Sequence, residues 1–301
     1  MPFVRKIVKT DTPMKLFLLL MRHFHISQKE AQKLIDTGRV YQNGVSVTDK
    51  SATVYGEIKV VVFEPQSRGL YPLFETKDFA IFDKPTGIMV HPRNRNTQYS
   101  LIDEIKHHFG LQANITHRID KETSGLVLAS KHKEAEKRLK QMFEAKEIKK
   151  RYLTLVKGRV AQELFIDEPI KLNRDYSRIK LKVVIDTTGK PAQTIIRPLY
   201  TFGDYTLVEA EPLTGRQHQI RIHLFHVKHP IVGDPIYGVD TDTAIRYLDG
   251  KMGVQERIEA TGAPRLMLHA HTLEFTWKES VYKIFSKQNF VQECFAIANQ
   301  K

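Results

Sequence analysis

A polar segment that contains proline and glycine, EPQSRG at 64–69, divides this chain into two parts with different sequence patterns. Domain boundaries fall in exposed linkers of this composition, because proline and glycine interrupt helices and strands. Short helical patterns followed by short strand patterns precede the segment, whereas strand-like apolar runs dominate after it. The chain has 301 residues, which is enough for two hydrophobic cores. We therefore expect two domains, at 1–65 and 66–301.

The first domain carries clear helix and hairpin signals. Ser27 is a favourable N-cap, and Glu30 three residues later completes a capping box. Gly38 stands where the helix should end, because glycine readily adopts the left-handed conformation that follows a C-cap. Asn43-Gly44 predicts a two-residue hairpin, because both central positions of a type I′ turn need positive φ. We expect a small αβ domain.

The pattern ISxxxAQKLIxxGxVxxNGxxV, which begins at Ile26, resembles the S-four-like RNA-binding module. The resemblance implies that this domain binds RNA, with Lys29, Lys33 and Arg39 as phosphate contacts. Gln28 stands where that module usually has a basic residue. For each lysine taken singly, a solvated helix face is the alternative interpretation.

The composition favours a polyanionic partner and argues against a membrane protein. The chain has 47 Lys and Arg against 34 Asp and Glu, which gives a formal net charge of +13. Such a charge attracts nucleic acid, and salt weakens the attraction. The apolar run at 16–21 is far shorter than the ~20 residues of a spanning helix. A single cysteine, Cys294, excludes an internal disulfide and a cysteine-based zinc site, so we expect a cytoplasmic protein.

The second domain has the pattern of an α+β fold around a mixed, mostly antiparallel sheet. Its strand-like runs are FAIFDKP, GLVLAS, YLTLVKG, TLVEAEPL, QIRIHLF and RLMLHAHTLEF. The clearest helix is expected at 132–147, with an apolar stripe that runs from Ala135 to Phe143. Residues 240–264 are expected to form an insertion of loop and helix.

The most informative short segment is HRIDKETSG at 117–125, which runs directly into the apolar GLVLAS. It places the carboxylate of Asp120 beside cationic and titratable side chains, on a turn before an expected buried strand. Such a turn can hold a reactive group on a rigid scaffold. The alternative is an ordinary turn aspartate that accepts hydrogen bonds from its own backbone.

Two further segments carry side chains suited to act with Asp120. In QIRIHL at 219–224, polar and apolar residues alternate, so we expect a strand with its apolar residues on one face. Arg221, on the other face, can hold a carboxylate with two hydrogen bonds and lower its pKa. Tyr152 opens another expected strand and offers a ring for base stacking and a phenol for proton transfer. Simple packing is the alternative for this tyrosine.

Six motifs in a fixed order resemble those of the RluA-type RNA pseudouridine synthases. They are DKPTGIMVHP at 83–92, HRIDKETSGLVLAS at 117–130, KKRYLTLVKG at 149–158, TGRQHQIRIHL at 214–224, HPIVGDPIYG at 229–238 and RLMLHAHTLEF at 265–275. They cover nearly all of residues 70–280, and as a set they are highly specific. The resemblance implies the pseudouridine synthase fold and the isomerisation of uridine in RNA to pseudouridine.

The resemblance also implies roles for the reactive residues. Asp120 would be the catalytic nucleophile, Arg221 its partner, and Tyr152 the base-stacking residue with a further role in proton transfer. An ionised aspartate can act covalently at the sugar or the uracil ring, or as a base that removes a sugar proton. Residue identity alone leaves these routes open.

Three further residues are assigned to the substrate by the same resemblance. Arg118 would help displace the target uridine from its stack. Extrusion of a base from a duplex costs roughly a few kcal/mol. Ile220 would pack beneath the base, and His117 would lie on the substrate side. The reaction needs neither redox chemistry nor phosphoryl transfer, so no cofactor and no metal is expected. The chain has no Walker loop, GxGxxG or HExxH motif.

Two other classes of protein compete with this interpretation. Clustered histidines at 218–229 suggest a metal-dependent hydrolase, although no acidic partner is patterned among them. The charge and the first domain also fit an RNA-binding or ribosome-assembly protein without catalysis. Within the synthase interpretation, large-subunit ribosomal RNA is the expected target, because two-domain members with the S-four-like module commonly act on it. Transfer RNA is the alternative, and we expect a monomer.

Overall fold

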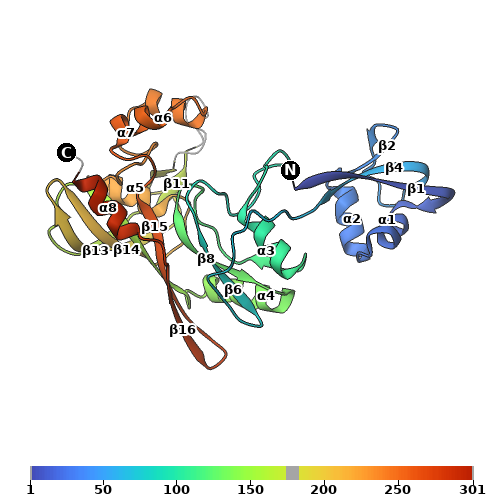
Figure 1. Cartoon of the computed structure of the whole chain (residues 1–301), viewed down its shortest axis with the longest axis horizontal. Helices are drawn as coiled ribbons and strands as arrows, with labels where there is room; N and C mark the ends of the chain where they lie inside the picture. The colour runs from blue at the N-terminus through green and yellow to red at the C-terminus, as the bar shows by residue number, and fades with distance from the viewer. Residues whose placement is uncertain (1, 174–182, 300–301) are drawn as a thin grey trace.

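A computed structural model describes residues 2–173 and 183–299 of the chain. Figure 1 shows a small sheet with two helices at the N-terminal end of the molecule and a larger α+β body beyond it. Within the described ranges, no helix is both long and apolar enough to cross a membrane. The larger body contains the elements that position the candidate site.

The N-terminal part is a four-stranded antiparallel sheet with two helices packed on it. Its elements are β1 (Phe3–Lys15), α1 (Leu16–Phe24), α2 (Gln28–Asp36), β2 (Val40–Gln42), β3 (Val45–Ser46) and β4 (Thr53–Phe63). The capping box of Ser27 and Glu30 is present, and Gly38 follows α2 with a φ of 61°, as predicted. Asn43 and Gly44 both have positive φ between β2 and β3, which confirms the hairpin. These elements share one hydrophobic core.

Ten strands form the main sheet of the larger body in the part of the chain that the structure describes. They are β5 (Phe74–Glu75), β6 (Phe79–Lys84), β7 (Asn114–Ile115), β8 (Ser124–Ser130), β9 (Lys149–Lys157), β10 (Leu164–Asp167), β13 (Gln193–Phe202), β14 (Tyr205–Pro212), β15 (Leu268–Trp277) and β16 (Ser280–Phe285). The order is β10-β13-β14-β9-β15-β8-β6-β5, with β16 on β15 and β7 on β8. Only β8 and β15 pair in parallel among these strands, so the predicted mixed, mostly antiparallel sheet is confirmed.

The remaining elements are a small strand pair and the helices of the larger body. They are β11 (Ile170–Leu172), β12 (Val183–Ile185), α3 (Leu101–Phe109), α4 (Lys133–Glu144), α5 (Gln219–His226), α6 (Thr241–Leu248), α7 (Val254–Thr261) and α8 (Phe290–Ala298). The predicted helix at 132–147 is α4, which His132 caps and which buries Ala135, Leu139 and Met142. Helices α6 and α7 confirm that residues 240–264 consist of loop and helix.

Strand β8, which begins directly after the Asp120 turn, is buried on both faces. Leu126 and Leu128 pack in the core that contains α4, whereas Val127 and Ala129 pack in the core that contains α3. All seven residues of the strand are buried, as its apolar sequence predicts. The turn that carries Asp120 therefore grows from a strand that is held from two sides.

Residues 219–224 were predicted as a strand, and that prediction was wrong, because they belong to helix α5. Ile220 and Leu224 pack in one core and Ile222 in another, as residues at i, i+4 and i+2 do on a helix. All of residues 219–224 are buried, and the polar ones among them have hydrogen-bond partners. An amphipathic helix is recognised in a sequence because polar, solvated residues alternate with apolar ones at a period of 3.6 residues. Residues 219–224 have no solvated face, so this pattern is absent.

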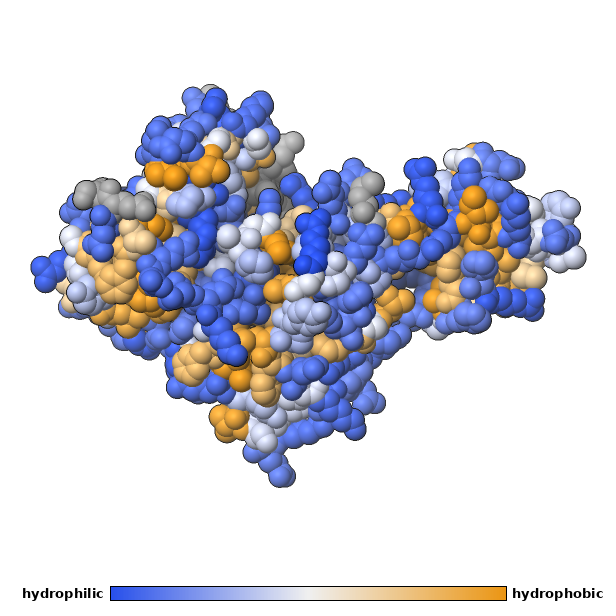
Figure 2. All heavy atoms as spheres, in the orientation of Figure 1, coloured by the Kyte–Doolittle hydropathy of each residue, from blue (hydrophilic) through white to orange (hydrophobic). Residues whose placement is uncertain are grey.

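The face of the molecule that Figure 2 shows is mainly polar. Figure 2 shows hydrophilic residues over most of the face seen in Figure 1. A hydrophobic patch lies over β13 and α8, where the rings of Tyr200, Phe202 and Phe295 contact one another. A mainly polar surface agrees with the net charge of +13.

Candidate active site

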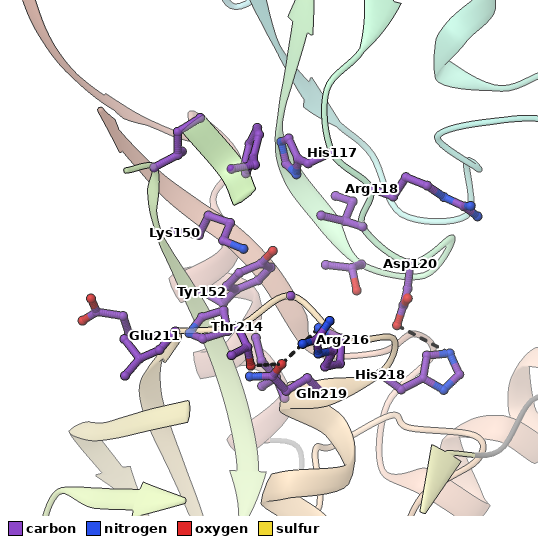
Figure 3. A pocket seen from close by; sticks show the side chains of 18 of the residues that line it. His117, Arg118, Asp120, Lys150, Tyr152, Glu211, Thr214, Arg216, His218 and Gln219 are labelled. Carbon is purple, nitrogen blue, oxygen red and sulfur yellow. Dashed lines mark hydrogen bonds and ion pairs between the residues drawn. The ribbon is translucent and has the colours of Figure 1, made fainter. Parts of the chain in front are cut away.

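The predicted catalytic residues line a single cavity of about 880 Å³. Asp120 comes from the turn before β8, Tyr152 from β9 and Arg221 from α5. Figure 3 shows Tyr152 beside Lys150 at one side of the cavity and Asp120 beside His218 at the other. Cavities that bind small ligands span roughly 300–1,000 Å³, so a nucleotide extruded from RNA can be accommodated here.

Arg221 connects two carboxylates. Its Nη1 donates a hydrogen bond to Oδ2 of Asp120 at 3.1 Å. Its Nε and Nη2 donate to Oδ2 and Oδ1 of Asp234 at 2.7 and 2.8 Å. Asp234 in turn accepts hydrogen bonds from the backbone amides of Ile236 and Tyr237. The structure therefore brings Arg221 to Asp120, as expected, and adds Asp234, to which the sequence alone assigned no role.

Asp120 is ionised at neutral pH. Burial alone would raise its pKa, but His218, Arg221 and Lys84 together hold that pKa below its usual value. Burial lowers the pKa of His218 to about 4, so this imidazole is neutral at pH 7. Arg221 is therefore the fully charged cation that acts on Asp120 at pH 7, and Lys84, whose pKa burial lowers to about 7, adds a partial positive charge. The side chain is 27% exposed, which leaves the charged carboxylate accessible from the cavity.

Lys84 supports the turn that carries Asp120. Its side chain is fully buried, and Nζ donates hydrogen bonds to the carbonyl oxygens of Pro85 and Lys121 at 3.0 and 3.2 Å. Burial lowers the pKa of Lys84 to about 7, against the opposing charges of Asp120 and Glu122. The contact to Lys121 fixes the backbone immediately after the reactive carboxylate.

His218 lies next to Asp120 and was not predicted as a site residue of a synthase. Its Nε2 is 3.8 Å from Oδ2 of Asp120, and its Nδ1 is 3.1 Å from the hydroxyl of Tyr237. The residue caps α5 in a left-handed conformation, with a φ of 54°. Its position depends on the helix start, which the sequence pattern did not reveal.

Tyr152 and Ile220 form an apolar part of the cavity wall. Their exposed fractions are 8% and 6%, and both line the cavity. Burial, together with the nearby charge of Asp120, raises the pKa of Tyr152, so its phenol is neutral at pH 7. A flat aromatic ring beside an aliphatic side chain is suited to stacking on a base.

His117 and Arg118 lie at another part of the cavity wall. Nε2 of His117 accepts a hydrogen bond from the amide of Leu128 at 3.0 Å, and its ring centre is 4.6 Å from that of Phe143. Burial, with the charge of Lys150, lowers the pKa of His117 to about 3, so the neutral ring carries its proton on Nδ1. Arg118 is exposed, so its guanidinium is available to RNA.

Gln219 shapes the loop along the lower side of the cavity in Figure 3. Its Oε1 accepts hydrogen bonds from Oγ1 of Thr214 at 2.7 Å and from the amide of Arg216 at 3.0 Å. Its Nε2 donates to the carbonyl oxygen of Gln193 at 2.9 Å. The first turn of α5 therefore fixes both the loop and, through Arg221, the carboxylate of Asp120.

The predicted RNA contacts of the N-terminal part differ in exposure. Lys29 and Lys33 are exposed one helical turn apart on α2, so both ammonium groups can reach a ligand. Arg39 is half-buried, and its guanidinium lies 5.1 Å from the ring centre of Phe3. Burial and the charge of Arg95 lower the pKa of Arg39.

The clustered histidines do not form a metal site. In the described ranges, no group of three or more His, Cys, Asp or Glu side chains is arranged to hold a metal ion. His223 has Oγ1 of Thr194 and the carbonyl oxygen of Glu168 as hydrogen-bond partners. His229 lies against the carbonyl oxygen of Lys157 at 3.0 Å. These histidines are part of the packed structure.

Comparison with known proteins identifies the family. The sequence profile of RNA pseudouridylate synthase matches residues 78–226, which include Asp120, Tyr152 and Arg221. An uncharacterized RNA pseudouridine synthase of Helicobacter pylori strain J99 is 40% identical over 289 residues, which cover 95% of this chain and 96% of that protein. Ribosomal large subunit pseudouridine synthase D of Escherichia coli K12 is 31% identical over 226 residues, covering 70% and 68% of the two chains.

A solved structure shares the fold. Human RNA pseudouridylate synthase domain containing 1 superposes with a TM-score of 0.60 and 24% identity, over 78% of this chain and 90% of that chain. The chain belongs to the RNA pseudouridine synthases of the RluA type. It is therefore an isomerase that modifies RNA, and the predicted family and fold class are confirmed.

Proposed function

We propose that this enzyme converts specific uridines of large-subunit ribosomal RNA to pseudouridine, with Asp120 as the catalytic group. The observation that carries the proposal is an ionised carboxylate that Arg221 holds in a nucleotide-sized cavity, opposite Tyr152. A preorganised carboxylate can stabilise positive charge that develops on the ribose during bond cleavage. It can also act as nucleophile or base, because it is unprotonated at neutral pH.

The reaction conserves all atoms of the uridine. The bond between N1 of uracil and C1′ of ribose breaks, the uracil turns while bound, and a bond forms between C5 and C1′. C5 then loses a proton and N1 gains one, so no electrons are exchanged with a redox partner. Asp120 would act on the sugar or the ring, and Tyr152 would stack on the uracil and assist the proton transfer.

Further residues would bind the substrate. Arg118, which is exposed at the cavity, would help displace the uridine from its stack, and Ile220 would pack beneath the base. His117 would present its Nδ1 proton to the nucleotide. Because the isomerisation involves neither redox change nor phosphoryl transfer, it would need no metal ion and no organic cofactor.

The two-domain division also belongs to the proposal. Residues 1–65 would act as an S-four-like RNA-binding module, and residues 66–301 as the catalytic domain. Lys29, Lys33 and Arg39 would contact phosphates, and the two exposed lysines would contribute more than the half-buried arginine. We further propose that the enzyme works as a monomer.

Relatives support the choice of ribosomal RNA. Proteins of Nitrosomonas europaea and Escherichia coli K12, both named ribosomal large subunit pseudouridine synthase D, are 34% and 31% identical to this chain. The alternative is that the enzyme isomerises uridine in transfer RNA. A ribosomal RNA target would place the enzyme in the cytoplasm. An RNA-binding role without catalysis would not need an ionised Asp120 facing a cavity.

Mapping of pseudouridine in total RNA from cells with and without the gene tests the proposal. We expect one or a few sites in large-subunit ribosomal RNA to lose pseudouridine, and the wild-type gene to restore them. The Asp120→Asn variant should bind RNA but restore none of the sites. Lost sites in transfer RNA alone would favour the alternative target, and full restoration by Asp120→Asn would contradict the role of the carboxylate.

A further inference from the structure

Helices α6 and α7 lie in residues 240–264, to which the sequence assigned no function. They follow the turn that carries Asp234 and reach back to the turn that carries Asp120. Two side chains make this contact, Tyr247 from α6 and Arg257 from α7. The helix pair therefore touches the part of the chain that presents the reactive carboxylate.

Both side chains bind Glu122. The hydroxyl of Tyr247 donates to Oε1 at 2.8 Å, and Nη2 of Arg257 donates to Oε2 at 2.5 Å. The guanidinium of Arg257 also lies 5.2 Å from the ring centre of Tyr247. The side chains of Arg257 and Glu122 are only 10% and 15% exposed. Charged hydrogen bonds that are shielded from water are stronger than exposed ones.

Arg257 also binds the second turn. The same Nη2 donates a hydrogen bond to the carbonyl oxygen of Gly233 at 2.9 Å. Gly233 directly precedes Asp234, and Glu122 is two residues after Asp120. One guanidinium nitrogen therefore links the turn of Asp120 to the turn of Asp234.

Two arginines thus join the same two turns. Arg221 connects the carboxylates of Asp120 and Asp234, and Arg257 connects Glu122, two residues after Asp120, to Gly233, one residue before Asp234. Together with the chain of the two turns, they form a closed ring of contacts that includes the Asp120 carboxylate and the guanidinium of Arg221. Catalytic groups must be held within about 0.5 Å of their productive positions, so such a ring bears on catalysis.

We propose that Arg257 is a positioning residue, which through Glu122 and Gly233 keeps the Asp120 turn in register with the Asp234 turn. Helices α6 and α7 would thereby set the geometry of Asp120 relative to Arg221 without touching the RNA base. The inference rests on the proposed catalytic role of Asp120.

Steady-state kinetics on a uridine-containing RNA substrate test the inference. Arg257→Met and Glu122→Gln should each lower kcat about 10-fold to 100-fold, because a displacement near 1 Å can cost that much. KM should change little, because neither residue binds RNA in this proposal. Arg257→Lys keeps the charge and should recover part of kcat. Arg246→Met, which removes an exposed ion pair between α6 and α7, is the matched control and should behave as wild type.

A double variant and amide hydrogen exchange complete the test. Glu122→Gln combined with Arg257→Met should be no slower than the slower single variant, because both changes break one link. Exchange at 120–123 and at 233–236 should increase in Arg257→Met and not in Arg246→Met. Unchanged kcat and unchanged exchange in Arg257→Met would overturn the positioning role. Full turnover by Asp120→Asn would instead overturn the proposed function, while the exchange result would still report on the link.

Discussion

Arg221 donates a hydrogen bond to Asp120 at 3.1 Å while its other two nitrogen donors are held by a second carboxylate, that of Asp234. The side chain of Asp234 is fully buried, whereas that of Asp120 is 27% exposed. Asp234 therefore orients the guanidinium of Arg221. The guanidinium in turn orients the carboxylate of Asp120, which faces the cavity.

Removal of this guanidinium should cost both stability and turnover. In Arg221→Met the buried charge of Asp234 loses its partner, which should lower the free energy of unfolding by about 3–5 kcal/mol. Urea unfolding followed by tryptophan fluorescence measures the loss. Replacing both partners, as Arg221→Met with Asp234→Leu, should recover part of the stability but none of the turnover. A double variant that is less stable than Arg221→Met would contradict this account.

Activity should depend on pH through Asp120. The pKa of this carboxyl is lowered in the folded protein, so kcat should be constant through neutral pH and fall only in acid, below the ordinary carboxyl pKa. The same shift stabilises the fold above the unfolded pKa of about 3.9, and that stabilisation is lost as pH falls through the folded pKa. In Arg221→Lys the acid limb of the profile should move to higher pH. An acid limb that does not move would mean that Arg221 does not set this pKa.

The turn of Asp120 and its following strand could be predicted because their signals are local. An apolar run directly after a turn gives a buried strand, and β8 is buried along its whole length. The capping box of α2 and the hairpin between β2 and β3 also depend on a few adjacent residues. The meeting of Asp120 with Arg221, 101 residues apart, could be expected only from the family resemblance.

The missed parts are those in which polar residues are buried. Helix α3, which was not predicted, carries Asp103 and Glu104 at fully buried positions, where Glu104 accepts hydrogen bonds from Ser67 and Arg68. Asp234 stands in a segment with proline and glycine and has the pattern of a turn residue. Its role depends on a partner 13 residues away on a helix that was predicted as a strand.

Tyr152 allows stacking and proton transfer to be separated. Its phenol is neutral at pH 7, because burial and the charge of Asp120 raise its pKa, so it can donate a hydrogen bond but cannot act as a base in that state. Tyr152→Phe keeps the ring and should leave KM nearly unchanged while kcat falls by roughly 10²-fold or more. Tyr152→Ala should also weaken RNA binding, by about 1–3 kcal/mol for one lost stacking contact. Single-turnover kinetics measure the loss of proton transfer, and binding titrations measure the loss of stacking. A wild-type kcat in Tyr152→Phe would leave stacking as the only role of Tyr152.

Lys150 should bind a phosphate of the RNA beside the target uridine. Its ammonium group is half-buried in the cavity wall, lies 5.8 Å from the ring centre of Phe143, and has no acidic partner in the described part of the chain. Burial lowers its pKa, so an anionic ligand would be favourable there.

Lys150→Met should therefore raise KM with little change in kcat, because a phosphate contact is present in both ground state and transition state. The slope of log binding constant against log salt should decrease by about 1. Lys140→Met is the matched control, because Lys140 is exposed on α4, paired with Glu136, and lies outside the cavity wall. A lower kcat at unchanged KM in Lys150→Met would mean that the ammonium acts on the uracil during the reaction rather than on the RNA backbone.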